Sequence, residues 1–130
     1  MPRSILIPVL LAGLTACSDA TAPTATGNWG GTDVSLTLTP SGGTLSYACG
    51  YGSIKPGWSL TGTGTFSAVG QHFFGGGPVP PQGHPPHPAI YAGRVDGDHL
   101  TLTVTLSDLQ TVLGPYDLTR DGPPVAEMCQ

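Results

Sequence analysis

A strict two-residue alternation of apolar and small polar side chains is the feature that most limits how this chain can fold. It is clearest in residues 100–106, where leucine and valine occupy every second position and threonine occupies the positions between them. Successive side chains of a β-strand point to opposite faces, so the pattern predicts a strand with one face in a core and the other in water. Helices repeat apolar residues three and four positions apart, and the sequence has no segment with that spacing.

Turn sequences separate several runs of this kind. Residues 34–39 alternate valine and leucine with serine and threonine, Pro40-Ser41-Gly42-Gly43 predicts a turn, and residues 45–49 continue the alternation, which together indicate a β-hairpin. A second tight turn is expected at Asp96-Gly97-Asp98, because glycine accepts the positive φ that such turns require. Further strands are predicted at residues 58–60, 64–70, 71–74, 90–95 and 112–119.

About seven or eight short antiparallel strands predict an all-β domain, either a small up-and-down β-barrel or a β-sandwich. The low content of charged residues, 9%, and the 20 glycines also suit strands joined by turns rather than helices. Consecutive hairpins favour the barrel, and so does the need to hide strand edges, which closure removes.

The first sixteen residues have the plan of a secretory signal peptide: a start carrying Arg3, an apolar stretch at 5–13, and a small-residue exit. The stretch is about half the ~20 residues that a membrane-spanning helix needs. The four residues Leu14-Thr15-Ala16-Cys17 then resemble the lipobox of bacterial lipoproteins. The alternative is an ordinary secretory signal with an unrelated cysteine near the cleavage point.

The lipobox resemblance implies cleavage before Cys17 and lipid on its sulfur, and so a membrane as a partner. Each buried methylene contributes roughly 0.8 kcal/mol, so two or three acyl chains hold a protein at a membrane where one would release it. Ser18 follows, not the aspartate that retains enterobacterial lipoproteins at the inner membrane, which favours the outer membrane. We therefore expect a signal peptide at 1–16, a lipidated flexible tether at 17–26 and one β-domain at 27–130.

The net charge and the cysteines agree with the expected location in the cell envelope. Cleavage would remove Arg3 and take the net charge below the −4 of the full chain, which gives no basic surface for nucleic acid. With Cys17 acylated, Cys49 and Cys129 remain, and in an oxidising compartment such a pair predicts a disulfide. Closing a loop of about eighty residues contributes roughly 4 kcal/mol in the chain-entropy model. A catalytic or metal-binding pair is the less favoured alternative, because the two cysteines lack close spacing.

Gly27-Asn28-Trp29 resembles the G-x-W signature that opens the barrel of lipocalins, avidins and their relatives. The resemblance implies that Trp29 closes one end of the barrel and that a basic residue of the last strand packs over it. Arg120 stands in the right place, and such a contact contributes roughly 0.5 to 2 kcal/mol. The layout also resembles small envelope lipoproteins of environmental bacteria, which implies no particular activity.

A proline- and glycine-rich segment at 75–88 is the one long irregular stretch, and it predicts a surface loop that can act as a binding loop or lid. Phe73 and Phe74 precede it and cannot both face inward on one strand, so we expect the loop to cover one of them and form a plug or the rim of a small pocket. His84 and His87 lie within the loop and His72 just before it. Solvated loop histidines are the favoured interpretation, and weak zinc or copper binding, with His72 or His99 as a third ligand, is the alternative.

The sequence does not predict an enzyme or a cofactor. Asp96 and Asp98 flank a turn glycine, no serine stands in a G-x-S-x-G elbow, and the glycine-rich stretch lacks the Lys-Ser/Thr ending of a phosphate loop. The expected function is an envelope-anchored binding or structural module with an envelope protein or a small apolar ligand as partner. The alternatives are a metal-binding accessory protein and a calycin-type carrier of an apolar ligand.

Overall fold

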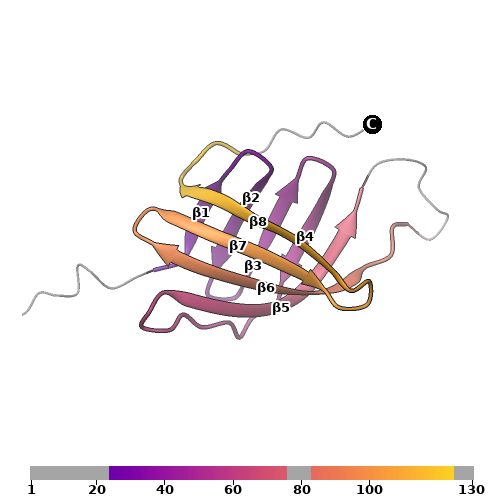
Figure 1. The fold of residues 1–130 in the computed structure, drawn as a ribbon, viewed down its shortest axis with the longest axis horizontal. Helices are drawn as coiled ribbons and strands as arrows, with labels where there is room; N and C mark the ends of the chain where they lie inside the picture. Colours follow the sequence, from indigo (N-terminus) through magenta and orange to yellow (C-terminus); the bar gives the residue numbers. More distant parts are fainter. Residues whose placement is uncertain (1–23, 76–82, 125–130) are drawn as a thin grey trace, which may run out of the picture.

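The computed structural model describes residues 24–75 and 83–124, and these form a closed antiparallel barrel (Figure 1). Each strand pairs with the next along the chain, and the last pairs with the first. The prediction of an up-and-down β-barrel is confirmed, and the sandwich alternative is wrong. Within the described ranges, no helix is long and apolar enough to cross a membrane. The strands of the described residues are β1 (Gly27–Gly30), β2 (Val34–Thr39), β3 (Gly42–Tyr47), β4 (Gly50–Ile54), β5 (Thr65–Phe74), β6 (His87–Asp96), β7 (His99–Leu106) and β8 (Thr111–Arg120).

Strand alternation places one face of every long strand inside the barrel. On β7 the leucines and valine are buried and the threonines between them are exposed or half-buried, and β2 follows the same pattern. The buried apolar side chains form a single cluster. Those with less than 2% of their surface exposed include Trp29, Tyr91, Leu36, Leu38, Leu45, Leu100, Leu102, Leu106, Leu118, Val34 and Val104.

Inward-facing glycines make room for the large rings of this core. A Cβ atom on Gly93 would overlap the ring of Phe66, and one on Gly52 would overlap the hydroxyl of Tyr91. Small and large residues therefore alternate around the interior so that the rings fill it, as in other small barrels. Among the described residues, these side chains pack the centre of the barrel as one cluster.

One end of the barrel is closed around Trp29. The indole Nε1 donates a hydrogen bond to the carbonyl of Ala25 (2.9 Å), and the guanidinium carbon of Arg120 lies 4.2 Å from the centroid of the Trp29 ring. Arg120 also donates to the carbonyls of Thr24 (2.8 Å) and Thr26 (3.3 Å). The structure thus brings together the two residues that the G-x-W resemblance paired, and residues 24–26 are tied across this end.

Several strand predictions were wrong in detail. β1 and β4 were not predicted, because their glycines and polar residues give no clear alternation. The predicted strand at 58–60 is a loop with one isolated bridge, from Leu60 to Phe66. The two segments predicted at 64–70 and 71–74 are the single strand β5, since Gly70 allows close backbone approach to Ser53 instead of ending the strand.

The turns were predicted more closely. The turn at Asp96-Gly97-Asp98 is confirmed, with β6 ending at Asp96 and β7 beginning at His99. The first hairpin has a shorter turn than expected, since β3 already begins at Gly42, and Cys49 lies in the turn between β3 and β4 instead of continuing the strand.

Replacing Arg120 with methionine keeps an apolar stem over Trp29 but removes the charge and the two hydrogen bonds to the N-terminal segment. We expect the free energy of unfolding to fall by about 2 kcal/mol, from the lost cation–π contact and lost hydrogen bonds. Urea denaturation followed by tryptophan fluorescence measures this. Arg94→Met is the control, since Arg94 is an exposed arginine on β6. Equal losses for both variants would contradict a special role for Arg120.

Candidate functional site

The end of the barrel away from Trp29 holds a cluster of aromatic and titratable side chains. β6 begins at this end, with His87. Its last residue, Asp96, lies at the opposite end of the barrel, because Asp96 pairs with His99 and His99 pairs with Thr119, next to Arg120. The cluster consists of Tyr47, His72, Phe74, His87 and Tyr116 and is called the His/Tyr end below. Its members come from β3, β5, β6 and β8, so closure of the barrel assembles it.

Two histidines face each other across β5 and β6. His72 and His87 are direct register partners on neighbouring strands, on either side of the loop that joins these strands. The ring of Phe74 packs edge-on against both, with centroid distances of 4.5 Å to His72 and 5.3 Å to His87. Tyr47 packs edge-on against His72 at 4.9 Å and lies 6.0 Å from Tyr116. The His/Tyr end is therefore a continuous set of ring contacts.

Two buried polar atoms at this end make no hydrogen bond within the described part of the chain: the hydroxyl of Tyr47 and Nδ1 of His72. Tyr91, a neighbour of Tyr47, donates its hydroxyl hydrogen to the carbonyl of Gln71 instead (2.6 Å). A buried polar group without a partner costs about 1 to 3 kcal/mol. Hydrogen bonding within the described residues is thus less complete at the His/Tyr end than at the Trp29 end.

Burial keeps these groups uncharged. Desolvation, and then the nearby His87, lower the pKa of His72 below its usual value of 6.5. Desolvation also raises the pKa of Tyr47, Tyr91 and Tyr116 above that of a free tyrosine, and Asp33 adds to the effect at Tyr116. At neutral pH His72 and these three tyrosines are therefore neutral hydrogen-bonding groups.

His87 is oriented by an acidic residue from another hairpin. Its Nδ1 lies 2.8 Å from Oδ2 of Asp108, in the turn after β7. Such a contact fixes the ring and directs Nε2 away from the carboxylate. Among the described residues, the side chain that hydrogen-bonds His87 is this carboxylate.

The histidines do not assemble a three-ligand metal centre within the described ranges. No group of three or more histidine, cysteine or acidic side chains there has the arrangement to hold a metal ion. His72 and His87 are neighbours, but the Phe74 ring packs against both imidazoles, and His84 does not complete a group with them. The alternative of a zinc or copper site formed by His72, His84 and His87 gains no geometric support.

The two phenylalanines before the loop lie on opposite faces of β5, as one strand requires. Phe73 is on the outer face, stacked on Tyr51 with ring centroids 4.5 Å apart. Phe74 lies at the His/Tyr end and is 40% exposed. The loop that was expected to cover one of them includes residues 76–82, which lie outside the described residues.

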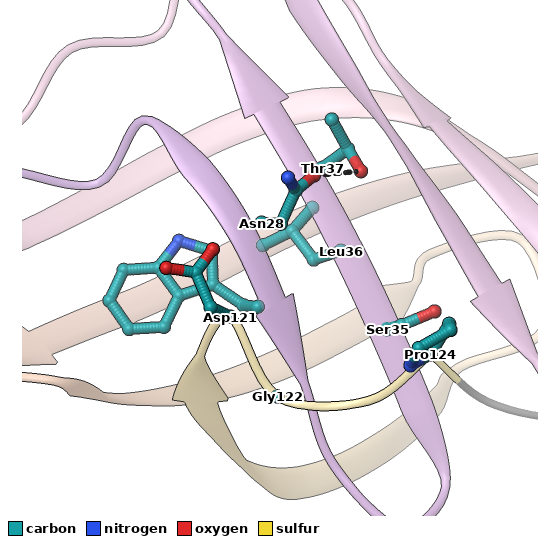
Figure 2. A pocket seen from close by; sticks show the side chains of 8 residues that line it. Asn28, Ser35, Leu36, Thr37, Asp121, Gly122 and Pro124 are labelled. Atoms are coloured by element: carbon teal, nitrogen blue, oxygen red, sulfur yellow. Dashed lines mark hydrogen bonds between the residues drawn. The ribbon is translucent and has the colours of Figure 1, made fainter.

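A hollow of about 360 Å³ lies on the outside of the barrel beside Trp29 (Figure 2). It is bordered by β1, β2 and the segment after β8, and the hydroxyl of Thr37 donates a hydrogen bond to Oδ1 of Asn28 on its wall (2.8 Å). Its lining mixes polar and apolar groups, and it is an open hollow on the outer surface, not an enclosed apolar chamber inside the barrel. The lining residues are Asn28, Trp29, Ser35, Leu36, Thr37, Asp121, Gly122 and Pro124.

Two members of the His/Tyr end, Tyr47 and Tyr116, received no functional role from the sequence, and neither did Asp108, which orients His87. A signal was present, since pairing β5 with β6 across the 75–88 loop would have placed His72 beside His87. Two predicted site residues, Cys17 and Cys129, lie outside the described residues.

Comparison of the chain with protein-family models, curated proteins and solved structures finds no significant match. The function therefore has to be inferred from the geometry.

The lowered pKa of His72 predicts a loss of stability in mild acid. The unfolded state takes up a proton as the pH falls through 6.5, while the folded state still holds His72 neutral, so the unfolded state binds more protons and is favoured. The loss can reach about 1.4 kcal/mol per pH unit for one such group. Replacing His72 with phenylalanine should flatten the dependence between roughly pH 5.5 and 7. Urea midpoints across this range measure it.

The matched control is His99→Gln, at an exposed histidine on β7. This variant should keep the pH dependence of the unmodified chain. If the pH dependence of stability persisted in His72→Phe and disappeared in His99→Gln, its source would be His99 and not His72.

Proposed function

We propose that this chain is a lipid-anchored protein of the bacterial cell envelope whose barrel is a binding module that acts through its surface. The observation that carries the proposal is the filled interior, in which the buried leucines and valines are 0 to 6% exposed and form one cluster. A barrel of this kind has no chamber for a ligand, so the groups that can contact a partner lie outside or at its ends. This favours an interaction module over a calycin-type carrier.

The anchor rests on the lipobox resemblance of Leu14-Thr15-Ala16-Cys17. The seven residues from Cys17 to Thr24 reach roughly 25 Å when fully extended, so a lipid on Cys17 would hold the barrel close to the membrane. Thr24 is itself hydrogen-bonded to Arg120. The barrel would therefore be attached through its Trp29 end.

A disulfide between Cys49 and Cys129 is part of the proposal. Pro124, the last described residue, borders the same hollow as Ser35, and Ser35 pairs with Ser46 on β3, close to the turn that contains Cys49. The five residues from Pro124 to Cys129 reach roughly 17 Å, which is sufficient to span β2 and β3. Such a bond would fasten the C-terminal segment over the outside of the barrel.

Replacing Cys17 with alanine tests the anchor. The unmodified chain is expected in the membrane fraction, with a mass that shows removal of residues 1–16 and addition of acyl chains. Cys17→Ala should lose the acyl mass and leave the membrane fraction, because the apolar contribution of the chains is gone. Ser18→Ala, which leaves the cysteine in place, should fractionate like the unmodified chain. Unchanged membrane association of Cys17→Ala would contradict the lipid anchor.

The filled interior predicts that the barrel does not bind an apolar probe. Titration with a fluorescent fatty acid at concentrations up to roughly 10 µM should leave the fluorescence of Trp29 and Trp58 unchanged, because the packed interior has no space for the acyl chain of the probe. A protein with an established fatty-acid cavity, titrated under the same conditions, is the positive control. Saturable binding to the unmodified chain at one site would support the carrier function instead.

A further inference from the structure

The loop between β4 and β5 holds a tryptophan at the edge of the barrel. Trp58 is half-buried, the centroid of its ring lies 5.7 Å from that of Phe66, and its Nε1 donates a hydrogen bond to the carbonyl of Thr39 at the end of β2 (2.8 Å). Lys55 and Pro56, which precede it in the loop, are exposed. The indole is therefore fixed in place with its N–H paired and part of its apolar ring open to the outside.

A hollow of about 350 Å³ separates this loop from the first described residues of the chain. Residues 24–26 form one wall, residues 58–60 form the other, and Pro40 of the turn between β2 and β3 borders both. The lining combines apolar side chains with the hydroxyl groups of serine and threonine, a mixture that suits the boundary between lipid headgroups and acyl chains. Pro40, Lys55, Trp58 and Leu60 are called the Trp58 rim below.

The Trp58 rim lies where the chain leaves the barrel toward the proposed anchor. Thr24 borders the hollow, and its carbonyl accepts a hydrogen bond from Arg120, so the described chain begins at this rim. Cys17 is seven residues away, which is roughly 25 Å at most. Figure 1 shows the β4–β5 loop on the same side of the barrel as the start of β1, and the β7–β8 turn on the opposite side. A lipid on Cys17 would therefore hold the rim within reach of the bilayer.

Lysine and arginine are found toward the same end of the barrel. Among the described residues, Lys55 directly follows β4, Arg94 is two residues before the end of β6, and Arg120 is the last residue of β8. The turns at the His/Tyr end carry Asp33 and Asp108 instead. An anionic bilayer therefore repels the His/Tyr end more strongly than the Trp58 rim.

Lys55 is remote from the acidic turn at its end of the barrel. Its backbone N–H donates to the carbonyl of Val69 (2.9 Å), and Val69 pairs with Ile90. Ile90 is six residues before Asp96 in the β6–β7 turn, which corresponds to about 20 Å along the strand. Asp121, another carboxylate of this end, lies beside β1, three strands away from β4. Within the described residues no carboxylate pairs with the ammonium group of Lys55, so its charge is available to a partner.

We propose that the Trp58 rim is the face of the barrel that contacts the membrane and that its partner is a bilayer containing anionic phospholipid. The inference rests on the proposed lipid anchor and adds the side chains that touch the lipid. Tryptophan rings are enriched at the level of lipid headgroups. The ring of Trp58 can enter that layer without exposing an unpaired donor, since its N–H is bonded to Thr39. Lys55 then lies at the level of the phosphates, where one lysine strengthens the contact about fivefold.

The rim sets the orientation of the barrel, and the acyl chains supply most of the affinity. One indole and one lysine alone would bind a bilayer weakly, but the anchor holds them beside it at a high effective concentration. β7 is eight residues long and so extends roughly 26 Å from one end of the barrel toward the other. The His/Tyr end, with the exposed Phe74 and the His87–Asp108 pair, is then directed away from the membrane. It is the end presented to a partner in the surrounding compartment.

Fluorescence quenching from within the bilayer tests the inference with the full acylated chain. The chain has two tryptophans, and Trp29 is 1% exposed inside the barrel. In vesicles of phosphatidylethanolamine and phosphatidylglycerol, phospholipids with brominated acyl chains should quench the emission of Trp58. Trp58→Phe keeps an aromatic ring on the rim and leaves Trp29 as the only tryptophan, so the emission of Trp58 is obtained by difference.

Position 109 supplies the matched control at the other end of the barrel. Leu109 is 45% exposed in the β7–β8 turn. The double variant Trp58→Phe, Leu109→Trp should show no more quenching than Trp58→Phe alone, because roughly 26 Å of strand separates this turn from the opposite end. Melting temperatures near that of the unmodified chain show that these substitutions leave the fold intact.

The lipid charge tests the role of Lys55. Replacing phosphatidylglycerol with phosphatidylcholine should lower the ratio of quenched to unquenched Trp58 emission about fivefold for the unmodified chain. Lys55→Gln should show no such difference between the two lipid mixtures. Arg94→Gln, which removes an exposed cation away from the rim, should behave like the unmodified chain. Equal sensitivity of Lys55→Gln and the unmodified chain would contradict the placement of Lys55 at the lipid surface.

The outcomes separate this inference from the anchor itself. A chain that floats with the vesicles while Trp58 stays unquenched would overturn the inference and leave the anchor standing, and the rim would then be free for a protein partner. Equal quenching at positions 58 and 109 would also overturn it, because the barrel would have no fixed orientation. A chain that carries no acyl groups and fails to float would overturn both the anchor and the membrane contact.

Discussion

The structure depends on the short seam between its first and last strands. β1 and β8 are aligned at only two register pairs, Trp29 with Arg120 and Gly30 with Thr119. Hydrogen bonds extend this seam, since the amide of Asp121 donates to the carbonyl of Asn28 (2.7 Å) and Arg120 holds the N-terminal segment. Without the seam, β1 and β8 would both be open strand edges, which favour pairing with other chains. The cation–π contact between Trp29 and Arg120 is therefore at the point where an open sheet becomes a barrel.

The two ends of the barrel differ in chemistry, and the seam lies near one of them. At the Trp29 end, backbone pairing closes the barrel and the polar groups of Trp29 and Arg120 have partners. The part of β8 before Thr119 lies beyond the register pairs with β1. There the ring of Tyr116 lies 6.0 Å from that of Tyr47 on β3, with a bulge between β7 and β8 nearby. At that end, β8 contacts the strands across from it through side chains and not through backbone hydrogen bonds to β1. The hydroxyl of Tyr47, which has no hydrogen-bond partner among the described residues, and the neutral His72 belong to this second end, so the titratable groups of the interior lie away from the β1–β8 seam.

Alternation in the sequence was sufficient to predict the class of fold, but it failed where glycine replaced the side chains that carry the pattern. β7 and the β2–β3 hairpin were predicted because leucine and valine mark every inward position. β4 was missed because two of its three inward positions, Gly50 and Gly52, are glycines that make space for neighbouring groups. The His/Tyr end was missed for another reason. The contact of His72 with His87 depends on register across a long loop, and the contact of His87 with Asp108 depends on where the β7–β8 turn lies. Neither contact is local in the sequence.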